Sequence, residues 1–311
     1  MLQRGVKMSI KKIETVCKVL KRGARKVFGE EVSVEMSRYI NLNTYDEAEK
    51  THPYYEEMLA GVVTSVRKVI RERGPIRILI LGAGTGIDTS AILQLGGIQQ
   101  LEVVDLDEHC LEILKKRIND GRLRCHCGDM VKFYREDQYD VILSVFSHDH
   151  VPQELGERLM KNIRRNLKPG GYYIMGGEIL SNFKTEGEWV ESLFRYHIHI
   201  IEKALKDFAF PVAHLEIEAL RSGFEKIGDF KRNVAQMESE LQSSGLTIQS
   251  SERIGPVEQE DIGGVYLFQM QKPLSVALDN TRFVDFSLTG IKTYPNTSLG
   301  NLEGNANVKV G

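Results

Sequence analysis

A near-continuous apolar run that ends in a glycine-rich loop is the feature that most constrains this fold. Residues 76–82, IRILILG, are almost wholly aliphatic, and the loop that follows holds Gly82, Gly84 and Gly86. A strand that is apolar along its whole length is typical of a parallel sheet with helices on both faces. Glycines at the end of such a strand let a ligand approach the backbone, so the stretch predicts a binding loop for a nucleotide-like ligand.

Strands and helices alternate after this loop. We expect further strands over residues 101–106, 122–130, 139–146 and 172–177, with helices over 88–95, 108–118 and 154–167 between them. This alternation predicts an α/β fold with a doubly wound, mostly parallel sheet. Two closing strands, over residues 246–255 and 264–272, are joined by a connection that suits a hairpin better than a crossover helix.

Helical segments and a polar tail accompany this core. We predict an N-terminal helical cap over residues 1–60, which begins with a basic amphipathic helix, and a sheet domain over residues 61–272. A single helix is expected over residues 46–73, where a Gly-Pro pair ends it. Aromatic and charged residues mix at helical spacing from about 181 to 231, which predicts an inserted lid. Residues 273–311 are rich in Asn, Gly, Ser and Thr and predict a loosely packed, flexible tail.

Composition excludes several classes of protein. A net charge of −2 over 311 residues creates no field that would attract nucleic acid or an anionic membrane. Four cysteines are too few for a disulfide framework, and no apolar run reaches the length of a membrane span. The basic N-terminus lacks the apolar block of a secretory signal. We therefore expect a cytoplasmic protein without a membrane partner.

The spacing of the glycines bears on which ligand the loop holds. The dinucleotide fingerprint G-x-G-x-x-G would place its third glycine at position 87, which is Ile87, so a bound pyrophosphate and an NAD(P) oxidoreductase are disfavoured. Asp105 ends the second strand, where a carboxylate can accept both ribose hydroxyls. Asp129 follows the third strand and can accept from an adenine amine, with Met130 against the ring.

Five motifs, taken in order, carry a resemblance to a known family. They are LILGAGTGID, VVDLDEHCLE, CGDM, YDVILSVFSHDHV and LKPGGYYIM. Together they resemble the successive motifs of the class I S-adenosylmethionine-dependent methyltransferases, over about residues 40 to 272. The resemblance implies a Rossmann-like sheet of seven strands whose last strand is antiparallel, S-adenosyl-L-methionine as cofactor, and methyl transfer as the activity.

The resemblance also assigns residues to the cofactor. It implies that the glycine loop faces the methionine and ribose, that Asp105 binds the ribose, and that Asp129 binds the adenine. The segment YDEAEKTHPYYEEML is similar to the one that closes over the cofactor in small-molecule members, which makes Tyr45 a lid contact. The expected cofactor-binding residues are Tyr45, Gly82, Ala83, Gly84, Gly86, Asp105, Leu106, Asp129, Met130 and Ser144.

Histidines are the candidates for catalysis. His148 and His150, in FSHDHVP, follow the fourth strand, where the family usually carries a histidine pair that shapes the pocket floor; His150 is a candidate general base. His197 and His199 lie two apart in a predicted helix, so at most one of them faces a substrate. We take His150, His148 and His197 as the expected catalytic residues. Glu178 can orient a substrate amine or cap the lid helix. No metal is expected, because nothing else with ligand spacing accompanies the histidine pair.

These expectations define an S-adenosylmethionine-dependent methyltransferase that acts on an O or N atom of a small molecule beneath the lid. The sequence does not identify the acceptor, and a homodimer is compatible with it. One alternative keeps the cofactor and transfers an aminopropyl or aminocarboxypropyl group. Another is an RNA-directed methyltransferase that uses the basic N-terminal helix, although the net charge makes a nucleic acid partner unfavourable. In a third, the Asn-rich tail is itself a peptide substrate.

Overall fold

The computed structural model describes residues 11–12, 15–22, 31–274, 282–287 and 290–295. The chain divides into a first unit, Met1–Pro273, and a second unit, Leu274–Gly311, which are described separately. The first unit is built on a seven-stranded sheet with the order β3-β2-β1-β4-β5-β7-β6. The strands are β1 (Ile76–Leu81), β2 (Ile98–Asp105), β3 (Leu123–Cys127), β4 (Tyr139–Val145), β5 (Leu167–Ile179), β6 (Thr247–Gly255) and β7 (Gly264–Gln271).

Strand directions confirm the predicted fold class. The strands β1 to β5 run parallel to one another, whereas β7 is antiparallel to both β5 and β6. The closing pair is therefore the hairpin that the short connection predicted. Strands are added to one side of β1 up to β3 and to its other side from β4 on, so the strand order switches between β1 and β4. Ligands bind α/β sheets at such a switch point, at the carboxyl ends of the strands.

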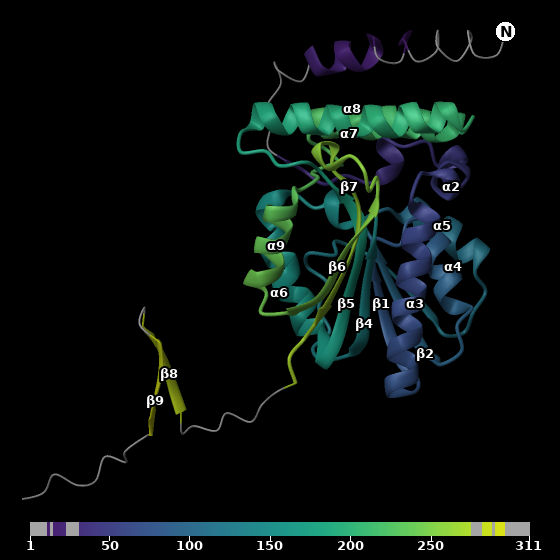
Figure 1. Cartoon of the computed structure of the whole chain (residues 1–311). Helices are drawn as coiled ribbons and strands as arrows, with labels where there is room; N and C mark the ends of the chain where they lie inside the picture. Colours follow the sequence, from purple (N-terminus) through teal and green to yellow (C-terminus); the bar gives the residue numbers. More distant parts are fainter. Residues whose placement is uncertain (1–10, 13–14, 23–30, 275–281, 288–289, 296–311) are drawn as a thin grey trace, which may run out of the picture. The chain divides into compact units, whose positions relative to one another are not determined.

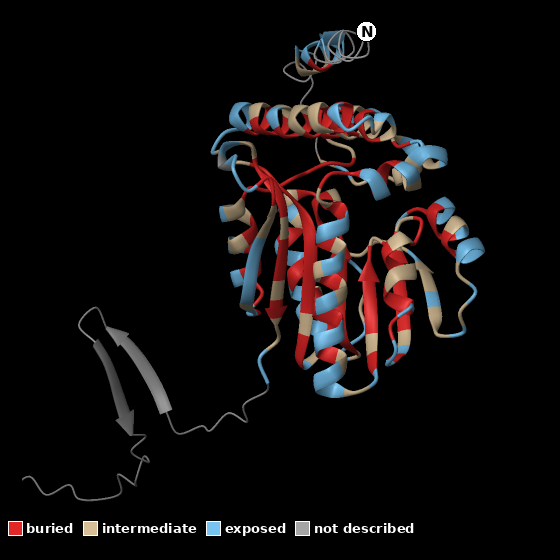
Figure 2. Cartoon of the chain, turned by 45° about the vertical axis from the view of Figure 1, so that its right-hand side comes forward, coloured by how far each residue is buried: buried red, intermediate tan, exposed pale blue. Residues whose placement is uncertain are grey.

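Two helical layers cover the sheet (Figure 1). One face is covered by α3 (Tyr55–Arg73), α4 (Ile87–Leu93) and α5 (Glu108–Arg117), and the other by α6 (Gly156–Asn166) and α9 (Val234–Ser243). Residues of β1 divide between the two cores by alternation: Ile78 and Ile80 pack with the first layer, whereas Leu79 and Leu81 pack with the second. The central strands β1 and β4 are thus buried on both faces, whereas the edge strand β6 is largely exposed and the helices expose their outer sides (Figure 2).

A helical lid lies across the carboxyl edge of the sheet (Figure 1). It consists of α7 (Glu186–Lys206) and α8 (Phe210–Glu225), which pack against each other through their own hydrophobic cluster. A capping box between Thr185 and Glu188 fixes the start of α7. Residues 15–22 are helical, and Cys17 is buried in the lid cluster, so the N-terminal helix contributes packing to the lid.

The prediction of one helix over residues 46–73 is wrong. The structure has two helices there, α2 (Leu42–Thr51) and α3, with a break between them at residues 52–54. Pro53 explains the break, because a proline disfavours helical geometry in the residue before it; His52 is extended, with ψ 132°. Tyr54 then takes a left-handed conformation, with φ 70°. The break turns His52 inward, where it is 5% exposed.

The second unit contains a short antiparallel hairpin of β8 (Arg282–Ser287) and β9 (Gly290–Pro295). The sequence pattern predicted no strands in this tail. Residues 275–281, 288–289 and 296–311 lie outside the described residues, as do residues 1–10 of the predicted basic N-terminal segment. Among the described residues, no helix combines the length and apolar character that crossing a bilayer requires.

Candidate functional site

The glycine loop after β1 makes a turn that other residues would not tolerate. Gly82, Gly84 and Gly86 all have positive φ angles, of 70°, 50° and 87°. A Cβ added to Gly82 would lie 2.4 Å from the Cβ of Ser147, which follows β4. A Cβ added to Gly86 would lie 2.7 Å from Cγ of Leu114 in α5. The glycines therefore let the loop pass close to both neighbours and leave its backbone accessible on the cavity side.

Asp105, the last residue of β2, is held against this loop. One of its carboxylate oxygens accepts from the Gly84 amide at 2.7 Å, and the other accepts from the Asp107 amide at 2.8 Å. Burial raises the pKa of Asp105 in spite of these two hydrogen bonds. Each oxygen retains a further acceptor position. The carboxylate is thereby fixed at the loop with capacity for two hydroxyl donors of a ligand.

A cavity of about 840 Å³ opens where β1, β2 and β4 end, and we call it the strand-edge cavity. Eight of the ten expected cofactor-binding residues line it: Tyr45, Gly82, Ala83, Gly84, Asp105, Leu106, Asp129 and Met130. Gly86 does not line it but caps α4, and Ser144 lies beneath it, with a 2.8 Å hydrogen bond to the hydroxyl of Ser147.

Asp88, which the sequence did not single out, is an acidic side chain of the same cavity. It is 6% exposed, and its Oδ2 has no hydrogen-bond partner among the described residues. Burial raises its pKa to about 7. A buried carboxylate oxygen without a partner is costly, so it fits a ligand that brings a cationic or N–H donor to this point.

The segment before the sheet closes the strand-edge cavity. The Thr85 hydroxyl donates to Asp46 of α2 at 2.5 Å, and Arg117 pairs with both residues, which fixes α2 over the glycine loop. Tyr45 lies above the loop, with its ring 3.9 Å from the Cβ position of Gly84. Four further lining residues come from an earlier part of this segment: Ser33, Val34, Met36 and Tyr39. The sequence did not predict them, because no motif marks these positions.

A second cavity, of about 480 Å³, adjoins the first and is called the inner chamber. Five residues line both cavities: Met36, Tyr45, Glu49, Phe146 and His150. The other polar residues of the inner chamber come from α8, the end of β5, and the loops after α2, β4 and α8: His52, Asp149, Glu178, Glu216, Asp229 and Lys231. Of these, only Glu178 was considered at the level of sequence. The chamber is thus strongly acidic and lies directly beside the strand-edge cavity.

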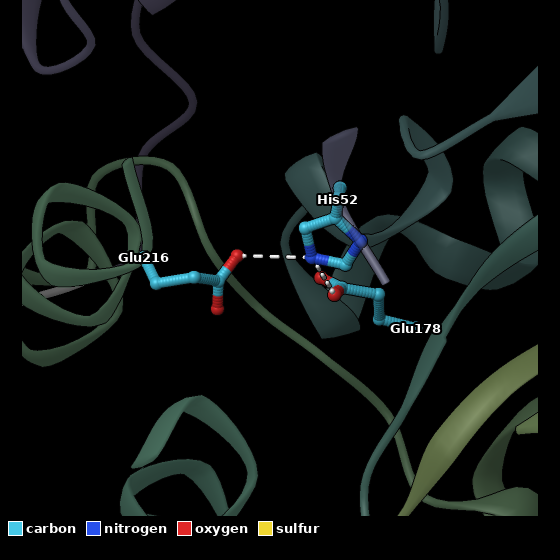
Figure 3. A group of neighbouring side chains, drawn as sticks. All are labelled: His52, Glu178 and Glu216. Atoms are coloured by element: carbon cyan, nitrogen blue, oxygen red, sulfur yellow. Dashed lines mark hydrogen bonds and ion pairs between the residues drawn. The ribbon is translucent and has the colours of Figure 1, made fainter. Parts of the chain in front are cut away.

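His52, Glu178 and Glu216 form a buried cluster in the inner chamber (Figure 3). The His52 Nε2 lies 3.2 Å from Oε1 of Glu216 and 3.4 Å from Oε1 of Glu178. Burial lowers the pKa of His52, but the hydrogen bond to Glu216 and the nearby carboxylates outweigh it and raise the pKa to about 9. His52 is therefore an imidazolium at neutral pH. The three ligand atoms are close enough together to hold a metal ion.

The three expected catalytic histidines occupy different places. His150 lines both cavities, and its Nδ1 donates to the Gly228 carbonyl. His148 is buried elsewhere, with its ring nitrogens 3.0 Å from the Tyr173 hydroxyl and 3.1 Å from Glu240. His197 is fully buried and lines neither cavity; it bridges Glu216 and Asp229. Only His150 faces a place where a reacting molecule can lie.

Comparisons with known proteins agree with this geometry. Residues 78–171 match the family model described as a methyltransferase domain. The chain is similar to malonyl-acyl-carrier-protein O-methyltransferase of Bacillus cereus, with 32% identity over 89 residues, which are 29% of this chain and 33% of the relative. It is also similar to polyamine aminopropyltransferase of Prochlorococcus marinus, with 28% identity over 168 residues, 50% of this chain and 54% of the relative.

A solved structure supports the fold. The CurJ carbon methyltransferase superposes with a TM-score of 0.53 at 18% identity, over 75% of this chain and 58% of that chain. This chain spans about a third to a half of the length of the two curated relatives. Residues 78–171, which match the family model, contain the glycine loop and Asp105.

Proposed function

We propose that the chain is a class I S-adenosylmethionine-dependent methyltransferase and that it transfers a methyl group to an N or O atom of a small molecule in the inner chamber; the match of residues 78–171 to a methyltransferase domain supports this proposal. The observation that carries this proposal is the junction of the two cavities. A ligand on the glycine loop and a molecule in the inner chamber would meet at the five residues that line both. Such a junction suits transfer between two bound molecules, since alignment and exclusion of water supply much of the catalysis.

The lining residues fit the cofactor part by part. Asp105 would accept hydrogen bonds from the ribose hydroxyls. Asp129 would accept a hydrogen bond from the adenine amine. The unpartnered oxygen of Asp88 would accept from the ammonium of the methionine portion. S-adenosylmethionine supplies a methyl group on a sulfonium, and the bonding pair of the S–CH₃ bond stays on sulfur as the acceptor's lone pair forms the new bond.

His150 is the proposed acceptor of a proton from the reacting group. Its Nδ1 donates to the Gly228 carbonyl, which can only accept, so Nδ1 carries the proton of the neutral ring. The Nε2 of that tautomer is then free to accept a proton. A hydroxyl acceptor needs this step, whereas an amine needs only to be presented in its neutral form.

Mass spectrometry of the products tests the proposal. Purified protein is incubated with S-adenosylmethionine labelled in the methyl group and a panel of small amines, alcohols and carboxylic acids. The proposal predicts a product that gains one labelled methyl group, with S-adenosylhomocysteine formed in equal amount. Binding of S-adenosylmethionine without any acceptor gaining the label, across all of these classes, would contradict it.

Aminopropyl transfer is a second candidate, favoured by two observations. One relative is named a polyamine aminopropyltransferase. In addition, no lysine or arginine is present among the described residues that line the strand-edge cavity, so no basic side chain there neutralises the methionine carboxylate. A decarboxylated donor would need no such partner. Incubation with decarboxylated S-adenosylmethionine separates the two activities, because the acceptor would then gain an aminopropyl group and methylthioadenosine would be released.

A further inference from the structure

An unpartnered carboxylate oxygen lies in the wall of the inner chamber. Asp149, in the loop after β4, is 5% exposed and lines the chamber. Its Oδ2 lies 3.5 Å from Nζ of Lys231, but its Oδ1 is buried and has no hydrogen-bond partner among the described residues. Leaving such an acceptor without a partner is unfavourable by more than a typical hydrogen bond contributes. The position therefore indicates a donor that the described part of the chain does not supply.

The charges around Asp149 indicate that this donor is a cation. Four carboxylates line the chamber: Asp149, Glu178, Glu216 and Asp229. Three cations balance them: Lys231 reaches Glu178 at 3.0 Å, His52 reaches Glu216 at 3.2 Å, and His197 reaches Glu216 at 2.7 Å. Burial lowers the pKa of both histidines, but neighbouring carboxylates raise it to about 9, so both are charged at neutral pH. Within the part of the chain that the structure describes, one negative charge of this group remains unbalanced, and one cation would neutralise it.

A metal ion is a poorer candidate than an ammonium. Glu178 already accepts from the Tyr196 hydroxyl at 2.7 Å and from Lys231. Glu216 already accepts from His197 and His52, so the oxygens of the cluster in Figure 3 are engaged. A metal would have to displace the Lys231 ammonium from Glu178 and the proton from His52. An ammonium ion needs neither change, because it can donate to the unused oxygen of Asp149.

The rest of the chamber suits an alkyl chain that leads towards the strand-edge cavity. Ile40, Phe146, Leu215 and Ala219 are apolar residues of its lining. Glu49 lines both cavities and is 5% exposed; burial raises its pKa to about 8. Glu49 is mostly protonated at neutral pH and becomes a carboxylate as the pH rises through about 8. In its carboxylate form it can take the proton of an incoming ammonium and leave a neutral amine beside the methyl donor.

From these contacts we infer that the inner chamber binds an alkyl diamine, with one ammonium at Asp149 and the second nitrogen near Glu49 as the methyl acceptor. This inference rests on the proposed function and names its substrate class. At the reacting nitrogen, the proton passes to Glu49, the lone pair forms the N–CH₃ bond, and the pair of the broken S–CH₃ bond stays on sulfur. The distal ammonium takes no part in this step and holds the chain in place.

Calorimetry on protein saturated with S-adenosylhomocysteine tests the inference. The probes are diaminobutane, butanediol as its neutral analogue, and succinate as an anion of similar length. We expect diaminobutane to bind at least roughly 10-fold more tightly than butanediol, and succinate not to bind. Equal binding of the diamine and the diol would overturn the inference.

Two aspartate substitutions serve as a matched pair. Asp149→Asn should lower the affinity for diaminobutane roughly 10- to 100-fold and leave the affinity for S-adenosylhomocysteine unchanged. Asp137→Asn, at a half-exposed residue paired with Lys272, should change neither. A diamine affinity that is the same in both variants would overturn the inference. If Asp149→Asn does not fold, the comparison of diamine with diol on the unsubstituted protein still decides.

Other outcomes distinguish a failure of the diamine inference from a failure of the proposed methyl transfer. Binding of S-adenosylhomocysteine without binding of any diamine refutes the inference alone. Failure to bind S-adenosylhomocysteine refutes the proposed function and, with it, the inference. A Mn²⁺ or Zn²⁺ ion that binds, excludes diaminobutane and is lost in Glu216→Gln would replace the ammonium with a metal site.

Discussion

His197 connects the two lid helices to the loop after α8, and its charge is expected to stabilise the fold. It lies on α7, with its ring nitrogens 2.7 Å from Glu216 of α8 and 3.1 Å from Asp229, and all three residues are at most 3% exposed. Burial and the charge of Lys231 lower the pKa of His197, but the two carboxylates outweigh them and raise it from 6.5 to about 9. This rise corresponds to roughly 3 kcal/mol of stability.

The sign of the pH dependence follows from the raised pKa. The contribution of His197 is fully present below its unfolded pKa of 6.5 and is lost as the pH rises through about 9. Removing the imidazolium leaves two buried carboxylates short of a partner, so His197→Gln should lower the free energy of unfolding by roughly 3 kcal/mol near pH 6. The difference between the variant and the unsubstituted protein should then shrink towards about pH 10.

Urea denaturation of both proteins across this pH range measures that difference. His52 and Glu49, whose pKa values are also raised, titrate in both proteins, so most of their contribution cancels in the difference. A difference that stays constant from acid to alkaline pH would refute the reasoning, because it would mean that titration of His197 does not change the stability over this range.

Three other substitutions test the site. Gly82→Ala combines a positive φ with a 2.4 Å approach to Ser147, so it should lower the free energy of unfolding by roughly 2–4 kcal/mol; an unchanged urea midpoint would contradict this. His150→Gln should reduce kcat roughly 100-fold for an acceptor hydroxyl without changing the affinity for S-adenosylmethionine, and an unchanged kcat would exclude it as the base. Asp88→Asn should weaken S-adenosylmethionine roughly 10-fold in calorimetry but leave adenosine unaffected; equal losses for both ligands would contradict a contact with the methionine ammonium.

The sheet and the strand-edge cavity could be predicted because their signals are local. The central strands β1 and β4 are almost wholly apolar runs, and β1 leads directly into Gly82 and Gly84 at the cavity. Asp105 and Asp129 follow neighbouring strands, and the carboxyl ends of parallel strands meet at one edge of a sheet. The positions of these residues in the sequence were therefore sufficient to predict that they lie close together.

The inner chamber could not be predicted in this way. His52 enters it because Pro53 breaks a helix that the apolar pattern had suggested was continuous. Glu216 and Lys231 reach it from the lid and the loop that follows, and no spacing in the sequence relates them to His52. His197 resembled a catalytic residue in the sequence, but its place inside a buried ion-pair network depends on how α7 packs against α8.

Calorimetric titration with S-adenosylmethionine and, separately, with NAD tests the central claim most directly. The account predicts that S-adenosylmethionine binds and that NAD does not. Asp105→Ala should weaken S-adenosylmethionine roughly 10- to 100-fold, because it removes the acceptor for the ribose hydroxyls. Binding of NAD without binding of S-adenosylmethionine would contradict the claim that the glycine loop and Asp105 form a site for a methyl donor.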